Sequence, residues 1–255
     1  ILAGYAIQFF SAPFAMVFDA FTFLFSSATL LRIRKPELAA DPLERRSVVH
    51  DLREGLRVVF GDRRLWSIAG CTGTSNFAAG AIFNALFVLF AVRQLGMNAA
   101  GIGLAGGIGA TAGVLGAFAA SRIAGTLGVG RTIVVSILMN GLGAIFLLVA
   151  TPSLAIPLLA VATALTFFGG VVYNINQVSL RQALVPLRLQ GRLNATMRFL
   201  VWGTLPIGSL VGGLLAGVLG LWRTIAVMTV VGLLAVLWVA VSPVRTIRRM
   251  PEPLA

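Results

Sequence analysis

The chain has 255 residues, of which 58% are hydrophobic and only 11% are charged, and its net charge is +12. Soluble domains carry roughly 45–50% apolar and about 25% charged residues, so this chain has too few polar side chains to cover a surface in water. The positive charges are spread between apolar runs rather than gathered on one soluble face, which excludes a nucleic-acid-binding domain.

The apolar runs predict membrane-spanning helices. They are continuous and long enough to cross a bilayer, which takes about 20 residues, whereas barrel strands would be about 10 residues with alternating polarity. A helix also satisfies its own backbone hydrogen bonds, as lipid requires. We expect whole spans at 14–31, 65–92, 99–120, 132–150, 154–178, about 194–219 and about 224–241.

Residues 1–31 are expected to hold the end of one truncated helix and one whole span. Asp19 is the only acidic residue inside any predicted span, and Thr22 and Ser26 follow it on the same face. An intramembrane carboxylate suggests proton coupling. The alternative is a structural role, because Asp19 would lie only about 8 Å from the outer end of its helix.

Residues 32–64 form a polar, basic loop that contains one amphipathic segment. Val48, Leu52, Leu56 and Val59 recur at helical spacing, with charged residues between them. This pattern predicts a helix that either lies on the membrane surface or packs on the bundle as a linker.

Positive charge falls on one side of the predicted topology. The loops on the side of residues 32–64 hold 18 Lys and Arg, and those on the other side hold 2. Cytoplasmic loops carry this excess. We therefore expect a multi-pass protein of the cell (inner) membrane with a six-helix bundle at 65–241 and a cytoplasmic tail at 242–255, for which nothing in the sequence predicts folding.

Small residues recur at spacings of three or four in two spans. Because lipid gives no hydrophobic drive for helix association, such stripes favour close helix packing over substrate contact. The glycines expected to pack are Gly106, Gly109 and Gly113 in one span and Gly213 and Gly217 in the other.

Polar residues concentrate in two other spans. Amides facing lipid without partners would cost several kcal/mol, so these side chains face other helices or a water-filled cavity. Several on each of two helices favour the walls of a polar cavity over simple interhelical bonds. The candidate substrate-binding residues are Asn76, Asn84, Tyr173, Asn174 and Gln177.

Residues for enzyme chemistry are scarce. The single histidine, His50, lies in the charged loop, and the single cysteine, Cys71, lies in an apolar run. Neither has the neighbours of a metal site or a nucleophile–base pair. We therefore expect no enzyme activity, metal or cofactor.

Three segments carry a resemblance to a known family. The chain resembles the C-terminal portion of major facilitator superfamily transporters, closest to the bacterial drug:proton antiporter branch with macrolide-efflux and enterobactin-exporter-like proteins. The segments are 18–24 (FDAFTFL), 51–57 (DLREGLR) and 179–213, which begins SLRQ and contains Pro186, Gly191, Arg192, Arg198, Pro206, Gly212 and Gly213.

The resemblance implies an all-α major-facilitator bundle with the end of the fifth helix and helices six to twelve, the N-terminal half of the same chain being a missing partner. The two polar spans would be the seventh and tenth helices, which line the cavity. The two glycine-striped spans would be the eighth and eleventh, which meet the other half. The family's basic turn motif is matched by Arg122 and Arg131, but Ser121 stands where an acidic residue is common.

The function implied is secondary active transport, with proton-coupled efflux of an amphipathic small molecule, drug or siderophore, by alternating access. The alternative is a non-transporting membrane scaffold or receptor-like protein. The expected partners are the small-molecule substrate and the lipid bilayer. Arginines at the cytoplasmic helix ends would either form a gate or serve topology alone; they are Arg122, Arg131, Arg181 and Arg192.

Overall fold

The computed structural model describes residues 17, 20–32 and 48–251, and the chain divides into two units, residues 1–47 and 48–255. In the first unit, Ala20–Leu30 form an apolar helix. The Ser27 hydroxyl donates a hydrogen bond to the Phe23 carbonyl, one turn earlier. The expected span at 14–31 is thus described only in part, and Asp19 lies outside the described residues.

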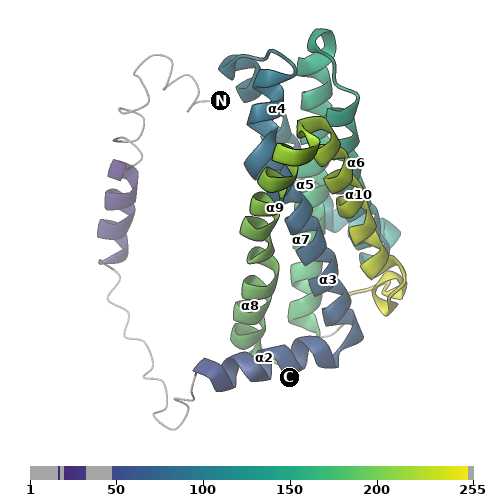
Figure 1. The fold of residues 1–255 in the computed structure, drawn as a ribbon. Coiled ribbons are helices and arrows are strands. Elements are labelled where there is room, and N and C mark those ends of the chain that lie inside the picture. Colours follow the sequence, from purple (N-terminus) through teal and green to yellow (C-terminus); the bar gives the residue numbers. More distant parts are fainter. Residues whose placement is uncertain (1–16, 18–19, 33–47, 252–255) are drawn as a thin grey trace. The chain divides into compact units, whose positions relative to one another are not determined.

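The second unit is a bundle of long apolar helices (Figure 1). Six helices in the described ranges are long and apolar enough to cross a membrane, and they match six of the seven expected spans. Every element described is helical, so the predicted all-α membrane bundle is confirmed. The six are Arg63–Arg93, Ala99–Leu127, Val129–Leu148, Pro152–Ala183, Leu187–Leu219 and Leu221–Ala240.

Some of these spans contain more than one element. Pro206 has no N–H to donate to the Trp202 carbonyl, and the span Leu187–Leu219 divides at this point. The elements are α2 (Val48–Gly61), α3 (Arg63–Ala79), the π-helix η2 (Gly80–Leu86), α4 (Phe87–Arg93), α5 (Ala99–Leu127), α6 (Val129–Leu148), the 3-10 helix η3 (Pro152–Leu154), α7 (Ala155–Ala183), α8 (Leu187–Trp202), α9 (Thr204–Leu219), α10 (Leu221–Ala240) and the 3-10 helix η4 (Pro243–Thr246).

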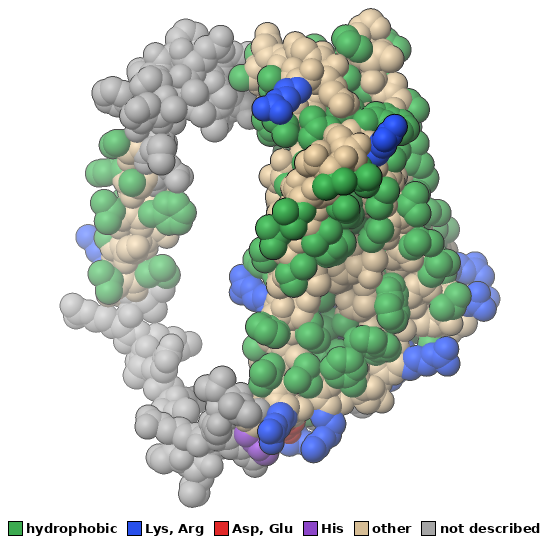
Figure 2. Space-filling view, in the orientation of Figure 1, with side chains coloured by type: hydrophobic (Ala, Val, Ile, Leu, Met, Phe, Trp, Pro, Cys, Tyr) green, Lys and Arg blue, Asp and Glu red, His purple; other side chains and the backbone are tan. Residues whose placement is uncertain are grey.

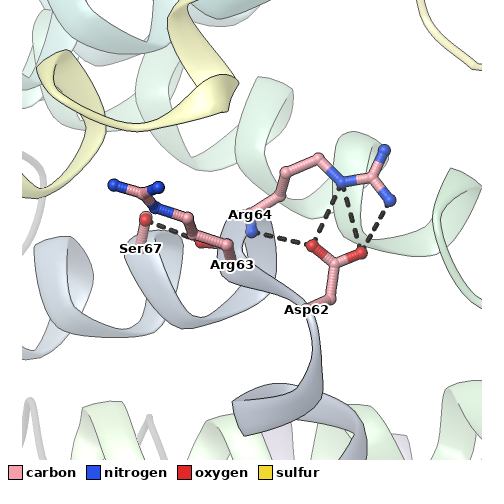
Figure 3. Close-up of polar contacts among 4 residues, drawn as sticks. All are labelled: Asp62, Arg63, Arg64 and Ser67. Atoms are coloured by element: carbon pink, nitrogen blue, oxygen red, sulfur yellow. Dashed lines mark hydrogen bonds and ion pairs between the residues drawn. The ribbon is translucent and has the colours of Figure 1, made fainter.

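The start of α3 is fixed by its N-cap residue, Asp62. Its carboxylate accepts from the backbone N–H of Arg64 at 2.7 Å and forms an ion pair with the Arg64 guanidinium at 2.6 Å (Figure 3). The Ser67 hydroxyl donates to the Arg63 carbonyl in the same turn. Asp62 thereby satisfies donors that the first turn of a helix leaves without partners.

Helix α7 packs chiefly against α5 and α6, while α3 packs against α10 and α9 packs against η2. Glycines allow the closest of these approaches. A Cβ on Gly109 of α5 would lie 2.7 Å from the Thr163 Cβ of α7, and one on Gly116 would lie 2.9 Å from the Phe168 carbonyl oxygen. Small residues on one face of α5 therefore bring the two backbones together.

The predicted packing glycines do not all lie at such contacts. A Cβ on Gly113 would be 3.5 Å from Val171 of α7. At Gly106, Gly213 and Gly217, however, a Cβ would meet no atom within 4 Å in the described part of the chain. Different glycines, Gly208 and Gly212, bring α9 against Phe77 and Ala81. The stripe predicted in α9 thus lies on the open side of that helix.

The amphipathic helix α2 packs on the bundle. It lies across the ends of α3 and α8 (Figure 1). Val59 is fully buried, Gly55 leaves no room for a Cβ against Thr196 of α8, and Glu54 forms an ion pair with Arg192 of α8. The helix therefore packs on the bundle, while its apolar Leu52 and Phe60 remain exposed.

Three boundaries and the tail differ clearly from the sequence-based expectation. The spans at 99–120 and 154–178 continue to Leu127 and Ala183, and the span expected from about 194 begins at Leu187. Residues 242–248 were expected not to fold, but they contain η4, and the N–H of Gly130 donates to the Ile247 carbonyl at 2.8 Å. The fully buried Val244 explains the difference, because it joins the core formed with α3 and α6.

Polar and apolar surfaces are separated along the second unit. Figure 2 shows hydrophobic side chains over the middle of the visible face and Lys and Arg mostly towards its two ends. Apolar side chains such as Phe118 and Val218 are 74% and 84% exposed. Such a surface suits a membrane protein, whose solvent over the middle of its height is hydrocarbon.

Candidate functional site

Tyr173 of α7 and Thr72 of α3 are joined in the interior. Tyr173 is 4% exposed, and its hydroxyl shares a 2.7 Å hydrogen bond with the Thr72 hydroxyl. The buried Cys71 lies beside the same phenol. Because α7 packs mainly on α5 and α6, this side-chain bond links α7 to α3 across the unit.

Gln177 and Arg181 continue the same face of α7 at a spacing of four residues. They are only 3% and 8% exposed. The Gln177 Nε2 group donates to Asn174 Oδ1 at 3.0 Å, but Gln177 Oε1 and Arg181 Nε have no hydrogen-bond partner among the described residues. Buried polar atoms are normally paired, so a water or solute that reached these two would gain hydrogen bonds.

We call the buried Tyr173, Gln177 and Arg181, together with the half-buried Thr72, the buried polar cluster. The Arg181 guanidinium is a fixed positive charge, and it lies close enough to Tyr173 for the two groups to interact electrostatically. The ion pairs found between described residues join other arginines to acids, Arg64 to Asp62 and Arg192 to Glu54. The cluster can therefore offer an anion or a carbonyl oxygen a charged donor away from water.

Asn76 has a structural partner. Its Nδ2 group donates at 2.8 Å to the carbonyl of Val201, beside the break between α8 and α9. The regular backbone hydrogen bonds of the helix are interrupted near Gly203 and Pro206. The Asn76 amide gives one carbonyl at this break an additional donor. One of the two amide groups expected on the cavity wall of the span at 65–92 therefore stabilises the helix break.

Asn140 of α6 is a functional candidate that was not predicted from the sequence. Its Nδ2 group donates to the Thr166 carbonyl at 2.8 Å, and its Oδ1 accepts from the Ser75 hydroxyl at 3.4 Å. Asn140 thus connects α3, α6 and α7. The available signal was an amide within the apolar run at 132–150.

Asn84 and Asn174 lie within spans and are exposed. Asn84 belongs to the π-helical segment η2, and single π-helical turns within α-helices are frequent at functional sites. Asn174 lies one position after Tyr173, so α7 carries a buried and an exposed polar group side by side. Exposed amides at this depth need water or another part of the protein as a partner.

The four predicted gate arginines have different surroundings. Arg122 of α5 and Arg131 of α6 are exposed, Arg181 is buried, and Arg192 is paired with Glu54 across the α2–α8 contact. The structure therefore does not show them as one ionic network. Arg192 ties α2 to the bundle, and Arg181 belongs to the buried polar cluster.

Two of the pockets in the second unit are lined by none of the five predicted substrate residues. The small one lies between Ser75, Phe83, Asn140 and Met228. The larger one, about 600 Å³, lies beside α6 and η4. Over the ranges described, no group of three or more His, Cys, Asp or Glu could hold a metal ion.

Comparison with known proteins places the chain in a family. The family model described as Major Facilitator Superfamily matches residues 1–204, which is most of the chain. No curated protein matches it significantly.

Proposed function

The chain belongs to the major facilitator superfamily of membrane transporters, and on that premise we propose that it exports amphipathic small molecules, drugs or siderophores, in exchange for protons. In this proposal the protein resides in the cell (inner) membrane. Its C-terminus is cytoplasmic, on the side with 18 of the 20 Lys and Arg.

The observation that carries the proposal is the pair of exposed amides within spans, Asn84 and Asn174. An amide that faces hydrocarbon loses its hydrogen bonds at a cost of several kcal/mol. A water-filled substrate path removes that cost, and its apolar neighbours would hold the hydrophobic part of an amphipathic solute. Gln177, bonded to Asn174, connects this surface to the buried polar cluster.

Alternating access requires a second half against which this bundle rocks. Of the six spans, Ala99–Leu127 and Leu187–Leu219 are the least buried over their most apolar stretches. Their outward glycines, Gly106, Gly213 and Gly217, would let helices of the other half approach closely. We assign these faces to that contact, and Arg122, Arg181 and Arg192 to contacts that change as the cytoplasmic side opens.

Transport by the intact protein in proteoliposomes tests the proposal. A fluorescent amphipathic dye and a macrolide are the probes, and a pH gradient of either sign is imposed. We expect uptake into inverted vesicles only with the gradient present, and a loss of at least about tenfold for Asn84→Ala or Asn174→Ala. Asn98→Ser, which keeps the N-cap of α5, is the matched control.

Two outcomes would contradict the proposal. If uptake does not depend on the pH gradient and equals the uptake by vesicles without the protein, proton-coupled export of these probes is excluded. Capture of a stable protein partner together with an absence of transport would favour the membrane scaffold instead.

A further inference from the structure

A basic pocket lies where the start of α6 meets the segment after α10. Its volume is about 600 Å³. The lining comes from the end of α5, the first two turns of α6, the end of α10 and η4 with the residues that follow. The lining residues are Leu127, Arg131, Val134, Val135, Ala240, Arg245, Thr246, Ile247 and Arg248. We call this the η4 pocket.

The walls of the η4 pocket are fixed by backbone contacts. The N–H groups of Val129 and Gly130 donate to the carbonyls of Arg248 and Ile247 at 3.3 and 2.8 Å. A Cβ on Gly130 would collide with the Val244 carbonyl, so only glycine permits this approach. Ser242 caps η4 by accepting from the Val244 N–H at 3.2 Å. Arg131 and the arginines of the tail therefore line one pocket from two adjoining segments.

The charge of the η4 pocket is uncompensated by the residues that line it. Arg131, Arg245 and Arg248 are all exposed, and no acidic side chain is among the lining residues. Within the described ranges, the ion pairs found involve other arginines. Three guanidinium groups in one pocket suit a phosphate, which accepts several of their N–H donors at once.

The same pocket also has an apolar side. Leu127 and Val135 are 45% and 50% exposed, although both belong to apolar spans. A free inorganic anion would leave this apolar surface uncovered, whereas the hydrocarbon chains of a phosphate ester would cover it. The pocket lies at the end of the α6 span that carries the basic residues, which is the level of the lipid headgroups.

We propose that the η4 pocket binds the phosphodiester headgroup of an anionic phospholipid. Arg131, Arg245 and Arg248 hold the phosphate, and the acyl chains run along Leu127, Val134 and Val135. Bound lipid ties the tail to α6, so it stabilises the end of the bundle without entering the transport path. The site is independent of the transported substrate.

Native mass spectrometry of the intact protein released from detergent tests this site. Phosphatidylglycerol, phosphatidylcholine and inorganic phosphate are added separately. We expect phosphatidylglycerol to bind best, and the triple variant R131Q/R245Q/R248Q to weaken its binding by at least about tenfold. The matched control, R57Q/R188Q/R249Q, removes the same charge from exposed arginines outside the pocket and is expected to bind nearly as well as the parent protein.

Each other outcome overturns the proposal. Equal weakening in both triple variants would show unspecific attraction to positive charge. Equal binding of inorganic phosphate and phosphatidylglycerol would show an anion site without lipid, and equal binding of phosphatidylcholine would remove the need for anionic lipid. If the first triple variant does not fold, a phosphatidylglycerol with a photoreactive headgroup is used with the parent protein. Crosslinking to residues 245–248 supports the proposal, and its absence overturns it.

Discussion

At the scale of single residues, the Tyr173–Thr72 hydrogen bond is the contact that joins α7 to α3. Thr72 also donates to the Ile68 carbonyl, so Tyr173→Phe leaves it a partner. We expect this change to cost about 0.5–1.5 kcal/mol of unfolding free energy, and Thr72→Val, which leaves a buried phenol without its partner, about 1–3 kcal/mol.

A double-mutant cycle in mixed micelles measures the Tyr173–Thr72 contact itself. We expect a coupling energy of about 1 kcal/mol between Tyr173→Phe and Thr72→Val, because each single change already removes the shared bond. Additive effects of the two changes would show that the bond contributes nothing.

Asp62 gives the clearest dependence on pH. The hydrogen bond from the Arg64 guanidinium holds the pKa of the Asp62 carboxyl below its ordinary value of 3.8. The folded state therefore favours the ionised carboxylate, whose stabilisation is complete above the ordinary pKa and is lost as pH falls through the lower folded value.

Substitution of Asp62 separates capping from charge. Asp62→Ala should cost about 1 kcal/mol at pH 7 through loss of the N-cap, whereas Asp62→Asn keeps a capping oxygen and should cost only a few tenths. The difference in melting temperature between the parent and Asp62→Asn should shrink as pH falls below 3.8. A constant difference down to the lowest accessible pH would contradict the assigned ion pair.

At the scale of helices, neighbouring glycines of α5 have opposite surroundings. Gly109→Ala places a Cβ 2.7 Å from the Thr163 Cβ, and such overpacking should cost about 1–3 kcal/mol. Gly106→Ala meets nothing within 4 Å, so its stability should be unchanged or slightly higher. Thermal unfolding in detergent, followed by size-exclusion chromatography, compares the two, and equal losses would contradict the α5–α7 packing.

Docking of α2 on α8 can be tested on α2 itself. Gly55→Ala places a Cβ against Thr196, whereas the Cβ of Gly61→Ala, at the end of the same helix, meets nothing within 4 Å. Trypsin should cut at the exposed Arg53 and Arg57 markedly faster in the Gly55 variant than in the parent, because undocking frees the helix to unfold locally. Equal cleavage in both variants would place α2 away from the bundle.

Helix positions were largely predictable, because long apolar runs leave little choice in lipid. The start of α8 was not, since Arg188, Gln190 and Arg192 make the segment look like a loop. The helix there continues because Leu193 and Met197 are buried on one face and Arg192 pairs with Glu54. Folding of the tail depends on the buried Val244 and on Ile247, which packs against the same core. Two apolar side chains among polar residues and prolines are too short a signal for a periodicity argument.

The candidate site was predictable only in part. Residue type identified Tyr173 and Gln177 as polar groups of an apolar span, but not that both are buried while Asn174 between them is exposed. Spacing alone likewise did not separate the inward Gly109 from the outward Gly106. Asn140 was missed because a single amide in a span is commonly an interhelical bond, and only the packed helices show that it joins three of them.

At the scale of the whole molecule, the bundle combines an apolar surface with polar groups at two kinds of place. The buried polar cluster lies inside the unit, and the amides of Asn84 and Asn174 lie on its surface within spans. In a protein that served only as a membrane anchor, exposed amides within spans would be unfavourable, because an amide in hydrocarbon loses its hydrogen bonds to water. A transporter needs them where solute and water pass.

Water access to Asn84 and Asn174 therefore tests the account most directly. Single cysteines at 84, 174, 118 and 218 are treated in native membranes with a membrane-impermeant, water-soluble thiol reagent; the native Cys71 is fully buried and gives little background. We predict modification at 84 and 174, and none at 118 and 218, although Phe118 and Val218 are 74% and 84% exposed in the second unit. Protection of positions 84 and 174 equal to that of 118 and 218 would contradict an aqueous path along this bundle.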